Sequence, residues 1–334
     1  MKRKIFFILG AILLLIIIAL FALSISSIPD KNLYGVSFNV SYANELLGSN
    51  WKDAYIEMLD DLKVKRLRLA AQWSLVEPTK DNYDWSALDF EINEAQKRDA
   101  EVILAVGRRL PRWPECHTPD WAAKISWEEQ KKEIESYINE VVSRYKDYSN
   151  IKYWQVENEP FLKAFAYEQC GDLDVDFFNK EIALVKKLDP TRKIIVTDSG
   201  NLGTWYGAYK RSDVFGTSVY VYLSNPITGP IRTFLPPSFY AIKKNFISLF
   251  LGNKPIILSE LSLEPWLLKS IKDTPIDEQI KLMNIDRFNE VVKYGKGTPF
   301  EQQYLWGVEW WYYLKLNDHP EYWDRVKEIF NSSN

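Results

Sequence analysis

The feature that most constrains the fold is a repeated alternation of short apolar runs with amphipathic segments along residues 33–334. Eight runs have the character of strands, and nearly all are followed by a segment with helical spacing of its apolar residues. Several runs, such as residues 102–106 (VILAV) and 255–259 (PIILS), are almost wholly apolar. Such runs are typical of strands buried on both faces, as in a parallel sheet covered by helices. Eight βα units in about 300 residues predict a closed (β/α)8 barrel, the TIM barrel.

The pattern gives approximate bounds for these elements. The expected strands are residues 33–40, 65–71, 101–107, 151–157, 193–197, 214–222, 255–260 and 304–310. The expected helices are residues 50–62, 85–98, 127–145, 175–188, 205–209, 238–251, 277–294 and 322–330. Because no long polar linker follows residue 32, residues 33–334 are expected to form one catalytic-type domain.

A second apolar feature precedes this domain. Residues 5–23 contain no charged side chain and follow three cations, Lys2, Arg3 and Lys4. A helix of this length spans about 28 Å, close to the hydrocarbon core of a bilayer. The positive-inside rule then predicts a cytoplasmic N-terminus and a transmembrane signal-anchor over residues 1–23, with residues 24–32 as a linker. We therefore expect a single-pass protein of the cell membrane whose barrel lies outside the cytoplasm.

A cleaved signal peptide is the alternative interpretation of the same segment, and it would make the protein secreted. The apolar core of a signal peptide is usually about 7–15 residues long and precedes a small-residue cleavage site. The run in this chain is longer, and residues 24–27 (SISS) offer only a poor site. These properties favour an uncleaved anchor, which makes the lipid bilayer a predicted partner.

Charge and composition exclude some classes of function. The net charge is −3 and no basic run occurs after residue 4, so nucleic acid is not an expected partner. His117 and His319 are isolated and lack metal-ligand spacing, and we predict neither a metal site nor a cofactor.

Cys116 and Cys170 lie in the loops after the third and fourth strands and are expected to form a disulfide outside the cell, with two separate thiols as the alternative.

Two carboxylates stand at strand ends, where such barrels place their active sites. Glu159 follows the fourth strand in the sequence Asn158-Glu159-Pro160, and Glu260 ends the seventh strand. These strands lie far enough apart around a barrel for the two side chains to face each other. Glycosidic cleavage requires such a pair, in which one group protonates the leaving oxygen and the other attacks the sugar or activates water. Arg68 on the second strand would help to keep one of them ionised.

These motifs resemble clan A of the glycoside hydrolases, the retaining (β/α)8-barrel enzymes that include cellulase-like and β-galactosidase-like members. The resemblance is carried by residues 153–160 (YWQVENEP), 255–260 (PIILSE), 66–78 (RLRLAAQWSLVEP), 82–89 (NYDWSALD), 213–222 (DVFGTSVYVY) and 307–313 (GVEWWYY). It implies that Glu159 is the acid/base and Glu260 the nucleophile. Glu264, which follows closely, is the alternative nucleophile.

The resemblance also implies a set of substrate-binding residues. These are Arg68, Trp73, Asn158 as the partner of a sugar 2-hydroxyl, Tyr220 as a hydrogen-bond donor to the nucleophile, and Trp310 as the floor of the sugar subsite. Trp306 and Trp311 are alternatives to Trp310. The chain departs from the clan at Glu157, where many members have Trp, and at Ser218, where many have His. Both departures leave the exact family and the sugar open.

The predicted function is therefore hydrolysis of β-linked O-glycosidic bonds in an oligo- or polysaccharide by a retaining glycosidase. A transglycosylase on the same site and a non-catalytic glycan-binding protein of the cell surface are the alternatives. Arg108, Arg109 and Arg112 form a cluster of cations after the third strand. This cluster fits either a solvated loop or recognition of a sugar carboxylate.

Overall fold

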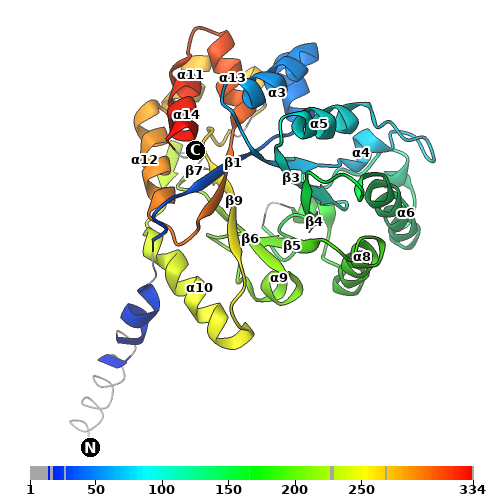
Figure 1. The fold of residues 1–334 in the computed structure, drawn as a ribbon, viewed down its shortest axis with the longest axis horizontal. Coiled ribbons are helices and arrows are strands. Elements are labelled where there is room, and N and C mark those ends of the chain that lie inside the picture. The colour runs from blue at the N-terminus through cyan, green and yellow to red at the C-terminus, as the bar shows by residue number, and fades with distance from the viewer. Residues whose placement is uncertain are drawn as a thin grey trace, which may run out of the picture.

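The computed structural model describes residues 14–15, 18–25, 28–164, 166–225, 229–267 and 269–332 (Figure 1). Eight parallel strands close into a barrel in the order β1-β10-β9-β6-β5-β4-β3-β2, which confirms the predicted fold. The barrel strands are β1 (Leu33–Ser37), β2 (Arg66–Ala70), β3 (Glu101–Val106), β4 (Ile151–Val156), β5 (Lys193–Asp198), β6 (Val214–Val219), β9 (Ile256–Ser262) and β10 (Gln302–Trp306). Their parallel order places the carboxyl ends of all eight on one face.

Helices surround the barrel and cover its outward side chains. The helices between or after the strands are α2 (Val40–Leu47), α3 (Trp51–Asp60), α4 (Trp73–Val76), α5 (Ser86–Lys97), α6 (Trp127–Tyr145), α7 (Tyr167–Cys170), α8 (Val175–Leu188), α9 (Tyr206–Arg211), α10 (Pro237–Leu251), α11 (Ile276–Leu282), α12 (Ile285–Lys296), α13 (Val308–Leu316) and α14 (Glu321–Asn331). Short 3-10 turns lie at Gly48–Asn50, Ala122–Lys124 and Ile271–Asp273. Local capping explains several boundaries: Ser126 and Glu129, for example, form a reciprocal capping box that starts α6.

Three predicted elements have different bounds, each for a local reason. The first strand stops at Ser37 because the side chain of Asn39 accepts the Tyr42 N–H and starts α2. The predicted helix 277–294 is two helices, because Asn284 caps the start of α12. The predicted strand 214–222 ends at Val219, and an antiparallel hairpin of β7 (Tyr222–Asn225) and β8 (Gly229–Arg232) follows.

The largest difference concerns the predicted strand 304–310. Strand β10 ends at Trp306, and Gly307 has a φ of 124°, a backbone conformation that side chains with a Cβ rarely adopt. Helix α13 begins directly afterwards at Val308. The aromatic residues that follow are therefore helical, and the alternation of a strand does not apply to them.

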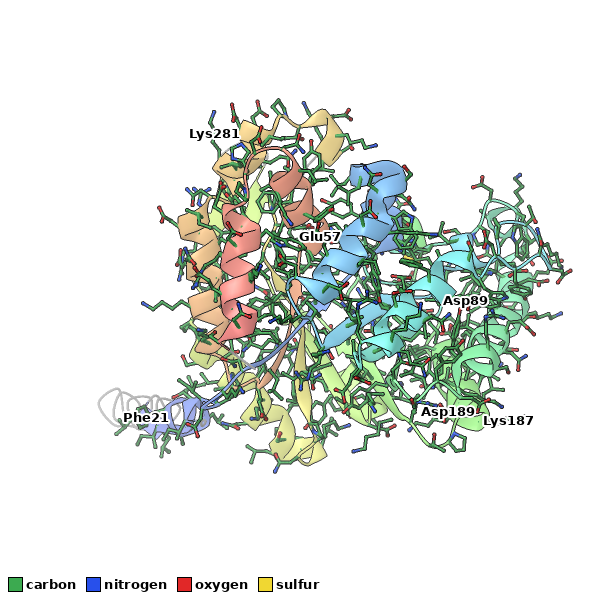
Figure 2. All side chains as sticks on the ribbon, turned by 45° about the horizontal axis from the view of Figure 1, so that its top comes forward. Phe21, Glu57, Asp89, Lys187, Asp189 and Lys281 are labelled. Atoms are coloured by element: carbon green, nitrogen blue, oxygen red, sulfur yellow. A yellow bond between two sulfur atoms is a disulfide. The ribbon has the colours of Figure 1, made fainter. Side chains whose placement is uncertain are left out.

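The predicted membrane segment is only partly described. Residues 1–13, 16 and 17 lie outside the described residues, so most of the run 5–23 is not placed. Residues 18–24 are helical, and Figure 2 shows Phe21 on this segment. The Asn245 side chain of α10 donates hydrogen bonds to the carbonyls of Leu23 (2.8 Å) and Ile25 (3.1 Å). Of the helices that can be described, none is both long and apolar enough to cross a membrane.

Candidate active site

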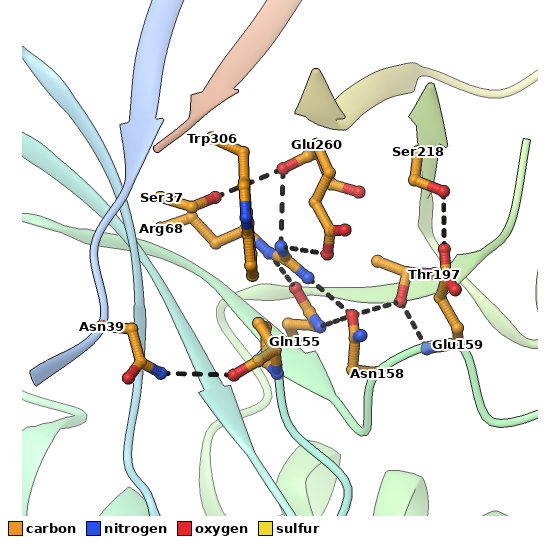
Figure 3. A network of polar contacts seen from close by, with 12 residues as sticks. Ser37, Asn39, Arg68, Gln155, Asn158, Glu159, Thr197, Ser218, Glu260 and Trp306 are labelled. Atoms are coloured by element: carbon orange, nitrogen blue, oxygen red, sulfur yellow. Dashed lines mark hydrogen bonds and ion pairs between the residues drawn. The ribbon is translucent and has the colours of Figure 1, made fainter. Parts of the chain in front are cut away.

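Glu159 and Glu260, the two carboxylates singled out in the sequence, both lie at the carboxyl-end face of the barrel. Glu159 follows β4, and Glu260 is in the last half of β9. Both side chains are buried, and Figure 3 shows them above the same end of the barrel, linked through a common polar network. The topology therefore brings together two residues that are a hundred positions apart in the sequence, as expected.

Glu260 lies between two hydrogen-bond donors. Nη1 of Arg68 lies 2.7 Å from one carboxylate oxygen, and the hydroxyl of Tyr220 donates to the other at 2.8 Å. The Arg68 side chain is almost completely buried, so little water screens its charge from the carboxylate. A cation and a hydroxyl donor both favour the ionised form of a carboxyl group. Glu260 thus has the surroundings that an attacking carboxylate requires.

The remaining donors of Arg68 tie the second strand to the fourth. Nε donates to Oε1 of Gln155 at 2.8 Å, and Nη2 donates to Oδ1 of Asn158 at 2.7 Å. The hydroxyl of Thr197 also donates to Oδ1 of Asn158, at 3.2 Å. Because the carbonyl oxygen of the Asn158 amide accepts these bonds, its orientation is fixed (Figure 3). The amide nitrogen is left as the donor that Asn158 can offer to a ligand.

Glu159 has a different environment. Its backbone N–H donates to the Thr197 hydroxyl at 2.8 Å, and the Ser218 hydroxyl donates to its Oε1 at 2.7 Å. Burial, followed by the negative charge of Glu260, raises the pKa of Glu159 to about 8. Glu159 is therefore protonated at neutral pH. Ser218, which the sequence marked as a departure from the clan, contacts the predicted acid directly.

Glu157 has a structural partner that the sequence did not reveal. Strand β4 ends at Val156, and Glu157 has a φ of 57°, so the alternation of side chains does not continue beyond the strand. The two carboxylate oxygens of Glu157 accept the backbone N–H groups of Arg108 (2.7 Å) and Arg109 (2.6 Å). The backbone N–H of Asn158 donates in return to the Arg109 carbonyl at 2.7 Å. Glu157 therefore fastens the loop after β3 to the segment that carries Glu159.

The carboxyl group of Glu181, on α8, forms a hydrogen bond with Glu157. Burial and the adjacent Glu157 raise the pKa of Glu181 well above its ordinary value. Burial also raises the pKa of Glu157, whose hydrogen bonds to Glu181 and to the two backbone amides oppose this effect. We interpret the pair as one proton shared between two carboxyl groups, with Glu181 as donor and Glu157 as acceptor.

This interpretation predicts different effects for two substitutions of Glu181. Glu181→Gln keeps a donor for Glu157 and should leave the free energy of unfolding nearly unchanged. Glu181→Ala leaves a buried carboxylate short of a partner and should lower the free energy of unfolding by about 1–3 kcal/mol. Urea denaturation at neutral pH measures both variants. Equal losses in the two variants would show that the shared hydrogen bond is not what matters.

The first two arginines after β3, Arg108 and Arg109, form hydrogen bonds and ion pairs within the protein. Arg108 donates to the Cys170 carbonyl at 2.6 Å and lies over the Trp127 ring. Arg109 forms an ion pair with Glu115 at 3.2 Å and donates to a backbone carbonyl. Neither arginine thus belongs to a solvated loop, and neither guanidinium is reserved for a sugar carboxylate.

Arg112 is the centre of a buried ionic cluster beside the mouth. It pairs with Glu264 and, at 3.4 Å, with Glu309, and its guanidinium lies over the rings of Tyr42 and Trp306. Burial raises the pKa of Glu309 to about 7, and Arg112 opposes this effect. Glu264, the alternative nucleophile, is thus held by Arg112, whereas Glu260 faces Glu159.

The structure contradicts two of the predicted aromatic contacts. Trp310 is fully buried in α13, where its indole N–H donates to Gln279 at 2.8 Å. Trp73 is fully buried in α4 and donates to Glu77 at 2.8 Å. Neither ring reaches the mouth, because each belongs to a helix that starts just after its strand and turns the ring into the core.

Two other tryptophans lie near the two carboxylates and their partners. Trp306, one of the alternatives, is the last residue of β10 and stands close to Arg68 and Glu260 in Figure 3. It lines a small hollow together with Ser37, Asn39 and Arg68. Trp266 is half-buried and lies 5.3 Å from the ring of Tyr220, centroid to centroid. Trp266 follows β9 without any strand pattern around it, and the sequence offered no signal for it.

The predicted disulfide between Cys116 and Cys170 is present. It joins the loop after β3 to the loop after β4, on the same face as Glu159. Within the described part of the chain, no three or more His, Cys, Asp or Glu side chains gather in a way that could hold a metal ion.

We predict that the double variant Cys116→Ser, Cys170→Ser is markedly less stable. The bridge closes a loop of 54 residues, and its loss should lower the free energy of unfolding by roughly 2–4 kcal/mol, chiefly because the unfolded chain is no longer constrained. Urea denaturation with and without reductant checks this: reductant should weaken the parent protein and leave the double variant unchanged. An unaltered midpoint in the double variant would contradict a stabilising role.

Comparison with known proteins gives the same fold and a related family. Residues 62–201 match the model of glycosyl hydrolase family 10. A curated relative, endo-1,4-beta-xylanase 1 of Gibberella zeae, is 25% identical over 144 residues, which cover 39% of this chain and 36% of the relative. The match thus spans about a third of that protein's length.

Solved structures with low sequence identity share the barrel. A family 10 endoxylanase from a sugarcane soil metagenome has 16% identity and a TM-score of 0.53, covering 87% of this chain and 90% of its own. A family 5 mannosidase from Rhizomucor miehei has 14% identity and a TM-score of 0.54, with 81% and 80% covered. The β-galactosidase of Rahnella sp. R3 has 15% identity and a TM-score of 0.54, with 92% and 56% covered. Together with the family model, these likenesses confirm the predicted resemblance to the clan A glycoside hydrolases.

Proposed function

We propose that this protein is a retaining glycoside hydrolase that cleaves β-linked O-glycosidic bonds of an oligo- or polysaccharide by double displacement. One observation carries the proposal, namely the unequal environments of the two facing carboxyl groups. Glu260 receives donors from Arg68 and Tyr220, whereas burial beside Glu260 raises the pKa of Glu159 to about 8. Pairs of carboxyl groups whose environments separate their protonation states in this way suit acid and nucleophile roles.

The proposed reaction has two steps. In the first, Glu159 gives its proton to the leaving oxygen while Glu260 attacks the anomeric carbon and forms a glycosyl ester. In the second, Glu159, now ionised, takes a proton from a water molecule that attacks the same carbon and releases the sugar with its configuration retained. Asn158, whose amide nitrogen remains available, is the proposed donor to the sugar 2-hydroxyl.

We propose a β-1,4-linked xylan as the first substrate to test. This choice is supported by the family 10 match over residues 62–201 and by the name of the Gibberella zeae relative. The neighbours named as mannosidase and β-galactosidase make mannans and β-galactosides the next candidates.

The experiment is a panel of polysaccharides and aryl β-glycosides, with reducing ends as the readout and NMR to follow the anomer released first. We expect turnover of at least one β-linked substrate, with the β-anomer as the initial product. Initial release of the α-anomer would contradict double displacement. Binding without turnover would favour a glycan-binding protein, and transfer to added sugar in preference to water would favour a transglycosylase.

We also propose that residues 1–23 anchor the protein in the cell membrane with the barrel on the outer side. The proposal is supported by the uncharged run 5–23 behind Lys2, Arg3 and Lys4, and by the Cys116–Cys170 disulfide, a bond typical of oxidising compartments. Identifying the N-terminus of the membrane-bound protein tests it. A chain that begins near Ser26 would show that the segment is cleaved.

A further inference from the structure

Helix α10 carries an apolar surface that the barrel does not cover. Phe246, Leu249 and Phe250, here called the α10 patch, are 51%, 73% and 67% exposed. The rings of Phe246 and Phe250 contact each other, with their centroids 5.1 Å apart. Single exposed apolar residues are common, but adjacent large ones mark a surface that binds something apolar.

The topology fixes where the α10 patch lies. Helix α10 returns along the outside of the barrel from the carboxyl end of β6 to the start of β9 at Ile256. The patch is in the last turns of this helix and therefore lies near the face where the strands begin. Strand β1 also begins on that face, at Leu33, so the preceding residues leave the barrel there too. Glu159 and Glu260 lie at the opposite face.

The α10 patch is adjacent to a second exposed apolar surface from the other end of the sequence. The side chain of Asn245 donates to the carbonyls of Leu23 and Ile25, which places the end of the N-terminal helix beside α10 (Figure 1). Most of the large apolar side chains around this contact are exposed, namely Ile18, Leu20, Phe21, Ile25 and Ile28. The second surface contains the last residues of the uncharged run 5–23 and the residues that directly follow it.

The charge of α10 agrees with a lipid surface as the partner. The helix contains no Asp or Glu, and its two charged residues are Lys243 and Lys244. Lys243 reaches back to the carbonyls of Gly200 and Gly203, at 2.8 Å each, and so helps to hold the helix against the barrel. Anionic headgroups repel carboxylates and attract cations such as the ammonium group of Lys244. Apolar rings fit the boundary between headgroups and acyl chains.

We propose that the α10 patch lies in the interfacial layer of the bilayer together with Ile25 and Ile28, which follow directly after the run of residues 5–23. The barrel then stands on the membrane by the face where its strands begin, with Glu159 and Glu260 directed away from the lipid. A soluble or wall-bound glycan can reach the site in this orientation. The inference rests on the proposed membrane attachment and is independent of the proposed chemistry.

The test uses the full chain in vesicles of phosphatidylcholine with a minor fraction of phosphatidylglycerol. Because Cys116 and Cys170 are bonded, Leu249→Cys supplies a single reactive thiol for a polarity-sensitive fluorophore. Leu202→Cys is the matched control, since Leu202 is 58% exposed but follows β5 at the opposite face. The probe at residue 249 should shift to the blue and lose about half or more of its emission with nitroxide-headgroup lipids, because interfacial side chains enter about 5–10 Å. The probe at residue 202 should do neither.

The variant Phe250→Asp, together with probe emission and vesicle flotation, separates a wrong orientation from a wrong membrane attachment. Adding Phe250→Asp to Leu249→Cys should return the emission toward that of the control, while vesicle flotation stays complete. If the chain floats with vesicles but the probes at residues 249 and 202 respond alike, the interfacial orientation is wrong and the attachment stands. If the chain does not float, the attachment is wrong and the inference falls with it. A blue shift at residue 249 that persists in detergent and scales with protein concentration would assign the patch to a second copy of the chain and overturn the proposal.

Discussion

Glu260→Gln is expected to abolish turnover of a confirmed glycoside substrate while leaving substrate binding in place. A glutamine has the same shape as the carboxylate and keeps an oxygen for the Nη1 donor of Arg68. An amide is not a nucleophile, so the glycosyl ester cannot form. Removal of a covalent nucleophile reduces kcat on the order of 10⁴–10⁶-fold in enzymes where it has been measured. Initial rates and calorimetric titration with the substrate measure the two effects separately.

Two further variants make this result specific. Glu264→Gln tests the alternative nucleophile, and it should retain turnover because Glu264 is paired with Arg112 away from Glu159. Glu301→Gln changes an exposed glutamate just before β10, and it controls for any effect of a Glu-to-Gln change that is unrelated to the site. Circular dichroism checks that all three fold. Full activity in Glu260→Gln together with loss in Glu264→Gln would assign the nucleophile to Glu264.

The barrel and the pair of candidate catalytic carboxylates were predictable because both depend on short-range signals in the sequence. Apolar runs such as residues 102–106 define buried strands, and a barrel of eight parallel strands places all carboxyl ends together. Once Glu159 and Glu260 are read as ending the fourth and seventh strands, their meeting follows from topology alone. Arg68 was found by the same argument, since it lies on a barrel strand, whereas the role of Tyr220 was implied by the resemblance to the clan.

The two wrong aromatic predictions arose differently. For Trp310 the strand pattern was continued past Gly307, where the backbone turns into α13, whereas Trp73 was assigned by the resemblance and lies at the start of α4. Both residues are in helices, where a periodicity of 3.6 rather than 2 decides which side chains face the core. Gly307 itself was the signal that the sequence offered for Trp310, because glycine after a β-prone run often marks the end of a strand.

The roles of Glu157 and Arg112 could not be predicted from the sequence. Glu157, after β4, pairs with Glu181 on α8, and Arg112 pairs with Glu264 and Glu309 from two distant segments. Such ionic contacts depend on packing between elements, which no local pattern encodes. They also change how the arginine cluster is understood: its charges hold the loop after β3 in place beside the active site, and the disulfide holds the same loop from its other end.

Removal of the proposed acid should change the pH profile as well as the rate. At neutral pH Glu159 holds a proton because its pKa is about 8, so kcat/KM of the parent should fall as the pH rises through about 8. Glu159→Gln should lose this alkaline fall, because glutamine does not titrate in this range. Its rate should drop by about 10²–10⁴-fold for substrates with poor leaving groups and far less for activated aryl glycosides, which need no proton in the first step.

Ser218→Ala separates Glu159 from other groups that titrate in the same range. Burial lowers the pKa of Lys243 to about 8, so Lys243 is a second possible source of an alkaline fall. The Ser218 hydroxyl donates to Glu159 and thereby lowers its pKa, so its removal should raise that pKa and move the fall to higher pH. Lys243 is bonded to the carbonyls of Gly200 and Gly203 and not to Ser218, which touches this region only by accepting the Gly200 N–H at 3.4 Å, so the same substitution should move the pKa of Lys243 far less. A fall that stays at the same pH in Ser218→Ala and persists in Glu159→Gln would belong to Lys243, and Glu159 would not be the acid.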